Sequence, residues 1–232
     1  MTTVYLIRHG ETANNQEKRC NGCRTNQPLN ERGEAQARAL SAYFSDHPVD
    51  TVHTSYLDRA KQTAMLAFGL DESALLVEPD LHEVDVGLWD GMLFPEIAEK
   101  YPEQWYNNKH RTSLAVYPEG EAIPDAAERV FGAFLRIVRE NRGKRIAIVA
   151  HGLALALLCQ RIFSWHLDRK NEMAGLSNTG FHLLEIDEKG HAEMMVWNCT
   201  DHLNTELWSK APYSTDVESV AAECRGGANL PL

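Results

Sequence analysis

The chain has 232 residues, of which 44% are hydrophobic and 24% charged, and its formal net charge is −10. This length supports one domain with a substantial core that needs no disulfide or structural metal. The negative charge disfavours bulk binding to nucleic acid or to an anionic membrane, so neither is an expected partner. No apolar run is long enough to span a bilayer. The five cysteines are mostly scattered, which predicts a reducing, cytoplasmic location.

Apolar segments of strand length alternate with segments of helical periodicity. The first, residues 4–7, is expected to be a strand and not part of a signal peptide. Further strands are expected at residues 49–54, 75–77, 145–150, 181–186 and 192–197. Helices are expected from Asn30 to about Ser45, from a Ser55 cap to near Gly69, from an Asp125/Glu128 capping box to Gly143, and from Leu153 to Phe163.

The alternation predicts one α/β domain over residues 1–232. Strands separated by helices favour a three-layer α/β/α sandwich with a mostly parallel central sheet. Glycines, prolines and aromatic residues cluster between Leu81 and Pro124, so we expect residues 84–124, called the lid segment below, to form a lid-like insertion over a site. The tail, residues 209–232, is expected to be surface-bound or mobile.

Two histidines come directly after predicted strands, and a glycine follows each of them. His9 follows the first strand, and His151 follows the strand at 145–150. The carboxyl ends of parallel strands meet at one edge of a sheet, so both imidazoles are expected there. Gly10 and Gly152 allow the backbone to turn sharply near a ligand. The helix after Gly152 is expected to point its free N–H groups at the same place, as an anion site.

Two arginines are expected beside these histidines. Arg8 precedes His9, and Arg59 lies in the first turn of the helix after the second strand. Together they make a positive cup, which suits the dianion of a phosphate monoester and the charge of its transition state. Nearby arginines would also lower the pKa of a histidine and keep one ring nitrogen free to attack phosphorus.

The leaving alkoxide of such a reaction needs a proton. A carboxylic acid in the stretch from Leu81 to Pro124 is the natural donor, and Glu83, in Leu-His-Glu-Val, is the best placed by sequence. Asp85, Glu11 and Glu121 are alternative donors.

Several short segments, in order along the chain, resemble the histidine phosphatase superfamily, also called the phosphoglycerate mutase-like family. The first is Arg-His-Gly-Glu-Thr at residues 8–12, with Asn15 after it. The others are residues 28–33, 55–64, 81–91, 118–121 and 149–152. The resemblance extends from residue 4 to about residue 200.

The resemblance implies roles for individual residues. His9 would be the phosphorylated nucleophile and Glu83 the proton donor, with Arg8, Arg59 and His151 completing the phosphate pocket. Substrate contacts are expected from Arg8, Asn15, Gly22, Arg59, His151 and Gly152. No metal and no organic cofactor are expected.

Three positions depart from the pattern of many family members. Asn21 stands where a glutamine is common, Asn26 where an aspartate is common, and Ala122 where a serine is common. None of these changes removes a group needed for the chemistry, so they concern the choice of substrate.

We therefore expect a metal-independent phosphomonoesterase that hydrolyses a small phosphorylated metabolite through a covalent phosphohistidine. The stretch between Glu83 and His151 is too short for the long insertion and basic tract of cofactor-dependent phosphoglycerate mutases. A mutase-type phosphoryl transferase and a non-catalytic phospho-ligand-binding protein are the alternatives. A homodimer is the default expectation.

Cys20 and Cys23 have the spacing of a redox or zinc half-site. No second pair of ligands accompanies them, so ordinary loop thiols are the favoured interpretation. The alternative is that a disulfide between them alters the access of substrate to the pocket.

Overall fold

The computed structural model describes residues 1–166, 176–208 and 227–232. Within these ranges, one seven-stranded sheet has the order β3-β2-β4-β1-β5-β6-β7. The strands are Thr2–Arg8 (β1), Thr51–Thr54 (β2), Leu76–Val77 (β3), Arg145–Ala150 (β4), Phe181–Ile186 (β5), His191–Cys199 (β6) and Ala228–Asn229 (β7).

The sheet is mixed and mostly parallel, which confirms the expected fold class. Strands β3, β2, β4 and β1 pair in parallel. Strand β5 is antiparallel to β1, β6 to β5, and β7 to β6. Strands β1, β2, β3, β4 and β6 therefore run in the same direction. The β5–β6 hairpin turns at Gly190, which has the positive φ of 86° that a glycine adopts without strain.

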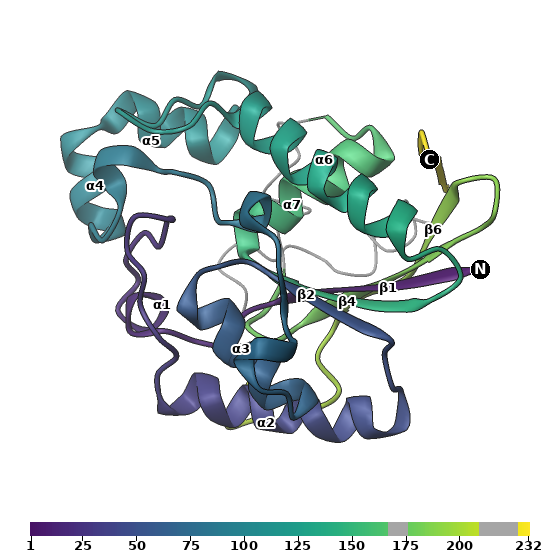
Figure 1. Ribbon diagram of the computed structural model, residues 1–232. Helices are drawn as coiled ribbons and strands as arrows, with labels where there is room; N and C mark the ends of the chain where they lie inside the picture. The colour runs from purple at the N-terminus through teal and green to yellow at the C-terminus, as the bar shows by residue number, and fades with distance from the viewer. Residues whose placement is uncertain (167–175, 209–226) are drawn as a thin grey trace.

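Alternating side chains of the central strands bury two hydrophobic layers. Val4 and Leu6 of β1 belong to the cluster formed with α6 and α7, whereas Tyr5 and Ile7 belong to the cluster formed with α2 and α3. Helices thus cover both faces of the sheet, as Figure 1 shows. Their bounds are Glu31–Asp46 (α2), Asp58–Phe68 (α3), Ile123–Glu140 (α6) and Gly152–Phe163 (α7).

The neighbouring strands β1 and β4 lead to helices on opposite faces of the sheet. After β1 the chain reaches α2 below the sheet, and after β4 it reaches α7 above it (Figure 1). Such a divergence leaves a crevice at the carboxyl ends of the two strands, where ligands of open α/β sheets bind. Arg8 pairs with Ala150 in the β1–β4 register, so His9 and His151 come next to one another at this edge.

The lid segment contains two short helices, α4 (Phe94–Lys100) and α5 (Pro102–His110). Both lie beyond the edge of the sheet, on the side of the short helix α1 (Ala13–Gln16) (Figure 1). Proline is tolerated in the first helical turn because its missing N–H would have no partner there. Pro95 and Pro102 each occupy such a first turn, so these prolines begin helices instead of marking loops.

Two predicted caps are wrong. Helix α3 begins at Asp58 with Leu57 as its N-cap, while the Ser55 hydroxyl accepts the Leu57 N–H at 3.3 Å and makes a turn before the helix. Helix α6 begins at Ile123 with Ala122 as its N-cap. Its Asp125 is inside the first turn, where a negative charge is favourable at the positive end of the helix dipole. In both helices a residue without a capping side chain holds the N-cap position.

Part of the predicted tail belongs to the sheet. Residues 209–226 lie outside the described residues. Strand β7 pairs with β6 at the sheet edge, and Leu230 beside it is buried in the α6–α7 core.

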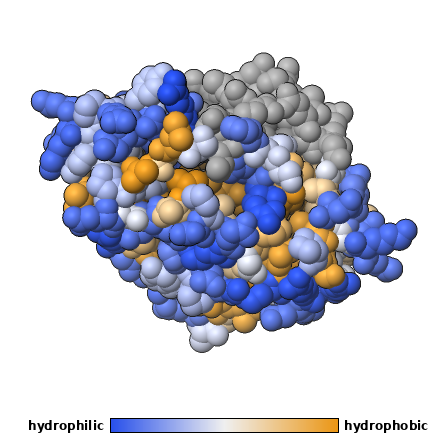
Figure 2. All heavy atoms as spheres, turned by 90° about the horizontal axis from the view of Figure 1, so that it is seen from above, coloured by the Kyte–Doolittle hydropathy of each residue, from blue (hydrophilic) through white to orange (hydrophobic). Residues whose placement is uncertain are grey.

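Among the described residues in the view of Figure 2, most of the surface is hydrophilic, and hydrophobic residues are exposed across the middle of this face. Among the residues that the structure describes, no helix is both long and apolar enough to cross a membrane.

Two substitutions should distinguish the buried core from the exposed surface of the lid segment by their effects on stability. Phe134 of α6 is fully buried, whereas Leu114 of the lid segment is 56% exposed. We expect Phe134→Ala to lower the free energy of unfolding by about 3–5 kcal/mol through lost burial and a cavity, and Leu114→Ala to change it by less than about 0.5 kcal/mol. Urea titrations of both variants measure this, and equal effects would contradict the assigned core.

Candidate active site

A pocket of about 130 Å³ opens at the carboxyl ends of β1 and β4. Among the residues predicted for the site, those that line it are Arg8, His9, Asn15, Glu83 and Gly152. Much of the remaining wall is aromatic and comes from the lid segment, through Trp89, Phe94, Trp105 and Tyr117. Gly22, Arg59 and His151 are not lining residues, and they contact one another behind the pocket.

His9 is held as a neutral ring. Its Nδ1 lies 2.6 Å from the carbonyl oxygen of Gly10, and because a carbonyl can only accept, Nδ1 carries the proton. Nε2 therefore has the free lone pair. Burial lowers the pKa of His9 well below its ordinary value, and the charges of Arg59 and Arg8 lower it further. The ring thus has the protonation state that a nucleophile needs.

Two side chains hold the backbone around His9. The buried Thr63 hydroxyl accepts the N–H of Gly10 at 2.9 Å and donates to the carbonyl of Arg59 at 2.7 Å. The amide of Asn178 donates to the carbonyl of His9 at 3.0 Å. The tautomer of His9 depends on the Gly10 carbonyl, so these contacts fix the direction of its Nε2.

His151 lies beside His9, with ring centroids 5.2 Å apart. Nε of Arg59 donates to its Nδ1 at 3.3 Å. An arginine keeps its proton, so Nδ1 of His151 is the acceptor and Nε2 carries the hydrogen. That Nε2 is buried and has no partner among the described residues. Burial, followed by the charge of Arg59, holds the pKa of His151 well below its ordinary value, so this ring is a neutral donor.

Arg59 is fully buried and bonded on all three nitrogens. Besides Nε on His151, Nη1 donates to the carbonyl of Thr25 at 3.0 Å and Nη2 to that of Gly22 at 2.8 Å. Burial lowers the pKa of Arg59, and the negative charges of Glu83 and Asp90 oppose that shift. The structure brings Arg59 next to His151, but its guanidinium holds a loop and a histidine and does not line the pocket, so its contact with substrate stays a prediction.

Glu83 occupies the N-terminus of α7. Its Oε1 accepts the N–H of Ala154 at 2.9 Å and its Oε2 that of Leu153 at 3.1 Å. Val84 donates to Oε1 as well, at 2.9 Å. The predicted free N–H groups after Gly152 are thus partly used within the protein, because a carboxylate satisfies unpaired helix donors and favours the positive end of the dipole. The same contacts fix Glu83 at the pocket wall.

The alternative acids are paired elsewhere. Asp85 forms an ion pair with Arg24 at 2.7 Å, Glu121 with Arg129 at 2.8 Å, and Glu11 with Arg32 at 3.5 Å. None of the three lines the pocket. Among these four carboxyl groups, only Glu83 does so.

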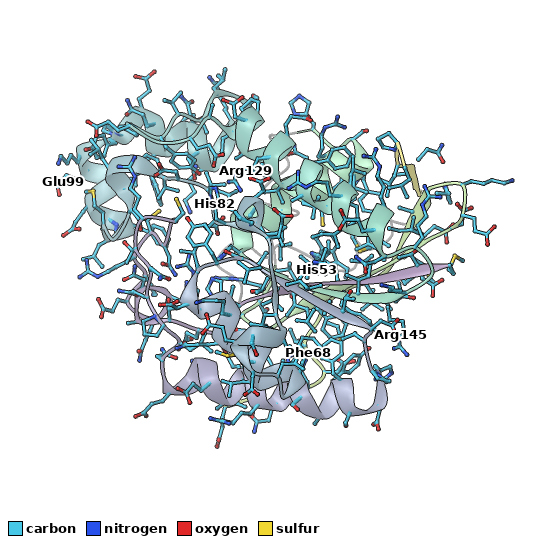
Figure 3. All side chains as sticks on the ribbon, viewed as in Figure 1. His53, Phe68, His82, Glu99, Arg129 and Arg145 are labelled. Carbon is cyan, nitrogen blue, oxygen red and sulfur yellow. The ribbon has the colours of Figure 1, made fainter. Side chains whose placement is uncertain are left out.

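Arg129 also supports the segment that carries Glu83. It extends from α6 toward His82 (Figure 3). Its Nη1 donates to the carbonyls of Asp80 and His82, at 2.6 and 3.1 Å. The backbone just before Glu83 is therefore tied to α6.

Comparison with known proteins shows which family the chain belongs to. The sequence profile of the histidine phosphatase superfamily (branch 1) matches residues 4–200. The chain belongs to the histidine phosphatase superfamily. The uncharacterized phosphatase PhoE of Bacillus subtilis is 34% identical over 70% of this chain and 78% of its own. The probable phosphoglycerate mutase GpmB of Cronobacter sakazakii is 31% identical over 70% of this chain and 75% of its own. The structure of YhfR from Bacillus stearothermophilus superposes with a TM-score of 0.82 at 28% identity, covering 88% of this chain and 100% of that one.

Two predicted contact residues of this histidine phosphatase have most of their polar groups engaged. The amide oxygen of Asn15 accepts from the Thr12 hydroxyl at 3.1 Å, although Asn15 still lines the pocket. The N–H of Gly22 donates to Asp90 at 3.1 Å, while its carbonyl accepts from Arg59. Gly22 thus contacts protein groups on both sides, and its contact with substrate stays a prediction.

Sequence reasoning missed Thr63, Asp90, Asn178 and the aromatic wall of the pocket. Thr63 lies one helical turn after Arg59, and Asp90 lies inside the matched segment 81–91, so both had a positional signal. Asn178 had none, because it reaches His9 across 169 positions of the chain.

No disulfide joins Cys20 and Cys23 in this histidine phosphatase. Burial raises the pKa of Cys23 to about 11, with Asp85 and Asp90 adding to the shift. A thiol with such a pKa is a weak nucleophile at neutral pH. A redox role for the pair stays a prediction. In the described part of the chain, no three His, Cys, Asp or Glu side chains cluster as a metal site would require.

The two lowered histidine pKa values predict how the protein responds to acid. Both folded-state values lie below 6.5, so the unfolded state binds more protons at acidic pH. Their contribution to stability is therefore complete above about pH 6.5 and falls as the pH decreases through that value. Nitrogen NMR should show neutral rings for His9 and His151 from pH 8 to pH 5.5. An imidazolium signal from either ring in that range would contradict the assignment.

Proposed function

We propose that this chain hydrolyses a small phosphorylated metabolite, with His9 as the nucleophile and a phosphohistidine as the intermediate. One observation carries the proposal. A neutral histidine with a free Nε2, an arginine and a glutamate side chain line one pocket, and a second histidine lies directly beside the first, with an Nε2–H that has no partner among the described residues. This is the set of groups that in-line phosphoryl transfer to nitrogen requires.

The first step forms a bond between His9 Nε2 and phosphorus while the ester P–O bond breaks. Arg8 and His151 would donate to the equatorial oxygens, where charge is largest in the transition state. Glu83 would give its proton to the leaving oxygen, and Oε2, which accepts one N–H where Oε1 accepts two, is the atom we assign to it. In the second step water attacks phosphorus, Glu83 takes the proton, the N–P bond breaks and phosphate leaves.

The relatives support hydrolysis and name the alternative. PhoE is called a phosphatase and GpmB a probable phosphoglycerate mutase, and both match similar shares of this chain. A mutase would use the same pocket residues but keep the phosphoenzyme from water. Phosphate release measured beside isomer formation from a phosphoglycerate distinguishes the two activities.

The remaining expectations stay predictions. They are the cytoplasmic location, the absence of nucleic-acid and membrane partners, the homodimer, the lid function of residues 84–124 and the independence from metal and cofactor. The net charge of −10 and the scattered cysteines support the first two.

Substitution of His9 tests the nucleophile. We expect His9→Ala to lower kcat for para-nitrophenyl phosphate by at least about 1,000-fold, because the covalent route is lost. An acid-labile, base-stable phosphoryl adduct should appear on His9 in the unsubstituted protein after rapid quenching, and not in the variant. EDTA should leave the rate unchanged. Activity of His9→Ala near that of the unsubstituted protein, or inactivation by EDTA, would contradict the mechanism.

Substitution of Glu83 tests the acid through the leaving group. An alkoxide leaving group needs protonation, whereas para-nitrophenolate hardly does. We expect Glu83→Gln to lower kcat/KM for an alkyl phosphate by about 100- to 10,000-fold, and that for para-nitrophenyl phosphate much less. Asp85→Asn, which removes a neighbouring carboxylate outside the pocket, is the matched comparison. Equal losses on both substrates would assign Glu83 a structural role at α7.

A further inference from the structure

The loop of residues 22–25 lies between the carboxylate of Asp90 and the guanidinium of Arg59. We propose that Asp90 is a positioning residue which, through this loop and Arg59, fixes the Nε2–H tautomer of His151. The inference rests on the proposed function in one respect, since it explains how the second histidine becomes a donor for the phosphoryl group.

Asp90 gathers three backbone N–H groups of the loop. Its Oδ1 accepts from Gly22 at 3.1 Å, and its Oδ2 accepts from Arg24 at 2.8 Å and from Thr25 at 3.0 Å. The approach is close enough to require glycine, because a Cβ on Gly22 would lie 2.9 Å from Asp90 Oδ2 and 2.5 Å from a Val86 methyl carbon. The carboxylate thus orients the peptide groups of the loop from the side of the lid segment.

Arg59 takes the opposite side of the same loop. Its Nη1 and Nη2 donate to the carbonyls of Thr25 and Gly22, so N–H groups face the anion and carbonyls face the cation. The charge of Asp90 also stabilises the buried cation. Each charged group favours the loop orientation that the other one requires.

The orientation of Arg59 decides the tautomer of His151. With both Nη atoms on loop carbonyls, Nε is the nitrogen that reaches His151 Nδ1, at 3.3 Å. If the carbonyls of Gly22 and Thr25 turned away, the buried guanidinium would need other acceptors, and its Nε would no longer point at His151. Nδ1 of His151 could then carry the proton, and Nε2 would become an acceptor that repels a phosphate oxygen.

A second contact between loop and lid segment provides a control. The guanidinium of Arg24 pairs with Asp85 at 2.7 Å, with side chains 44% and 28% exposed. Arg24→Ala removes this ion pair but leaves the backbone N–H on Asp90. If Asp90 merely anchored the loop, both substitutions would act alike.

The test compares Asp90→Asn with Arg24→Ala. Asparagine has the shape of aspartate, but its NH₂ group cannot accept the N–H that one carboxylate oxygen accepts. We expect Asp90→Asn to lower kcat/KM by about 10- to 100-fold and to weaken binding of inorganic phosphate. We expect Asp90→Glu, which keeps the carboxylate, to lose less kcat/KM than Asp90→Asn. We expect Arg24→Ala to keep kcat/KM within about twofold of the unsubstituted protein.

Nitrogen NMR of the imidazoles gives the deciding measurement. The unsubstituted protein and Arg24→Ala should show His151 with its proton on Nε2, and Asp90→Asn should show a mixture of tautomers. An unchanged tautomer in a well-folded Asp90→Asn protein overturns the proposal, whatever its activity. If the unsubstituted protein hydrolyses no phosphate monoester, the proposed function fails, but the tautomer comparison still decides the role of Asp90.

Discussion

The parallel pairing of β1 with β4 determines where the polar groups of the pocket lie. Arg8 pairs with Ala150, and the N–H of His9 donates to the carbonyl of Ala150 at 3.0 Å, so the two histidines leave the sheet at the same level. A shift of one residue would exchange the two faces of a strand. Because both strands are buried on both faces, such a shift would place the large residue Tyr5 in the wrong core layer. Hydrophobic packing therefore sets the positions of the site's histidines.

Arg59 connects the positions of the two histidines with the electrostatics of the site. A buried cation is costly unless hydrogen bonds and opposite charges compensate it. Here two loop carbonyls, the ring of His151 and the charges of Glu83 and Asp90 do so. In return, burial lowers the pKa of His9 and of His151, and the positive charge of Arg59 lowers both further. Both imidazoles are neutral for the same reason, but their tautomers differ, because the Gly10 carbonyl accepts from one ring and Arg59 donates to the other.

Glu83 stabilises the start of a helix and also lines the pocket. Its contacts with Leu153 and Ala154 satisfy the start of α7, the helix that follows His151. The residue directly before the lid segment thereby helps to hold the helix beside the second histidine. The aromatic wall formed by Trp89, Phe94, Trp105 and Tyr117 reaches the same pocket from the lid segment. The lid segment thus supplies the aromatic part of the pocket wall, next to Glu83, which directly precedes it.

Local patterns were sufficient for six strands and for the helices α2, α3, α6 and α7, but not for β7 in the predicted tail. The apolar runs of β1 and β4, the Asn30 cap and the Gly69 stop depend on neighbours within a few residues, which sequence displays directly. The cap of α3 and the helices of the lid segment were less readable. A proline in the first turn of a helix and a proline in a loop look alike in sequence, and packing around Trp89 decides between them.

The sequence by itself determined that His9 and His151 follow strands, that Arg8 and Arg59 accompany them, and that Glu83 is the best-placed acid. The placement of the histidines and arginines needs only strand direction and the order of elements, whereas that of Glu83 rests on its segment, residues 81–91. Only the tertiary structure decided what each polar atom contacts. The guanidinium of Arg59 turns to a loop and a ring instead of the pocket, and the N–H groups after Gly152 meet Glu83. Such choices depend on which partners remain unsatisfied once distant segments are buried together, and no local pattern contains that information.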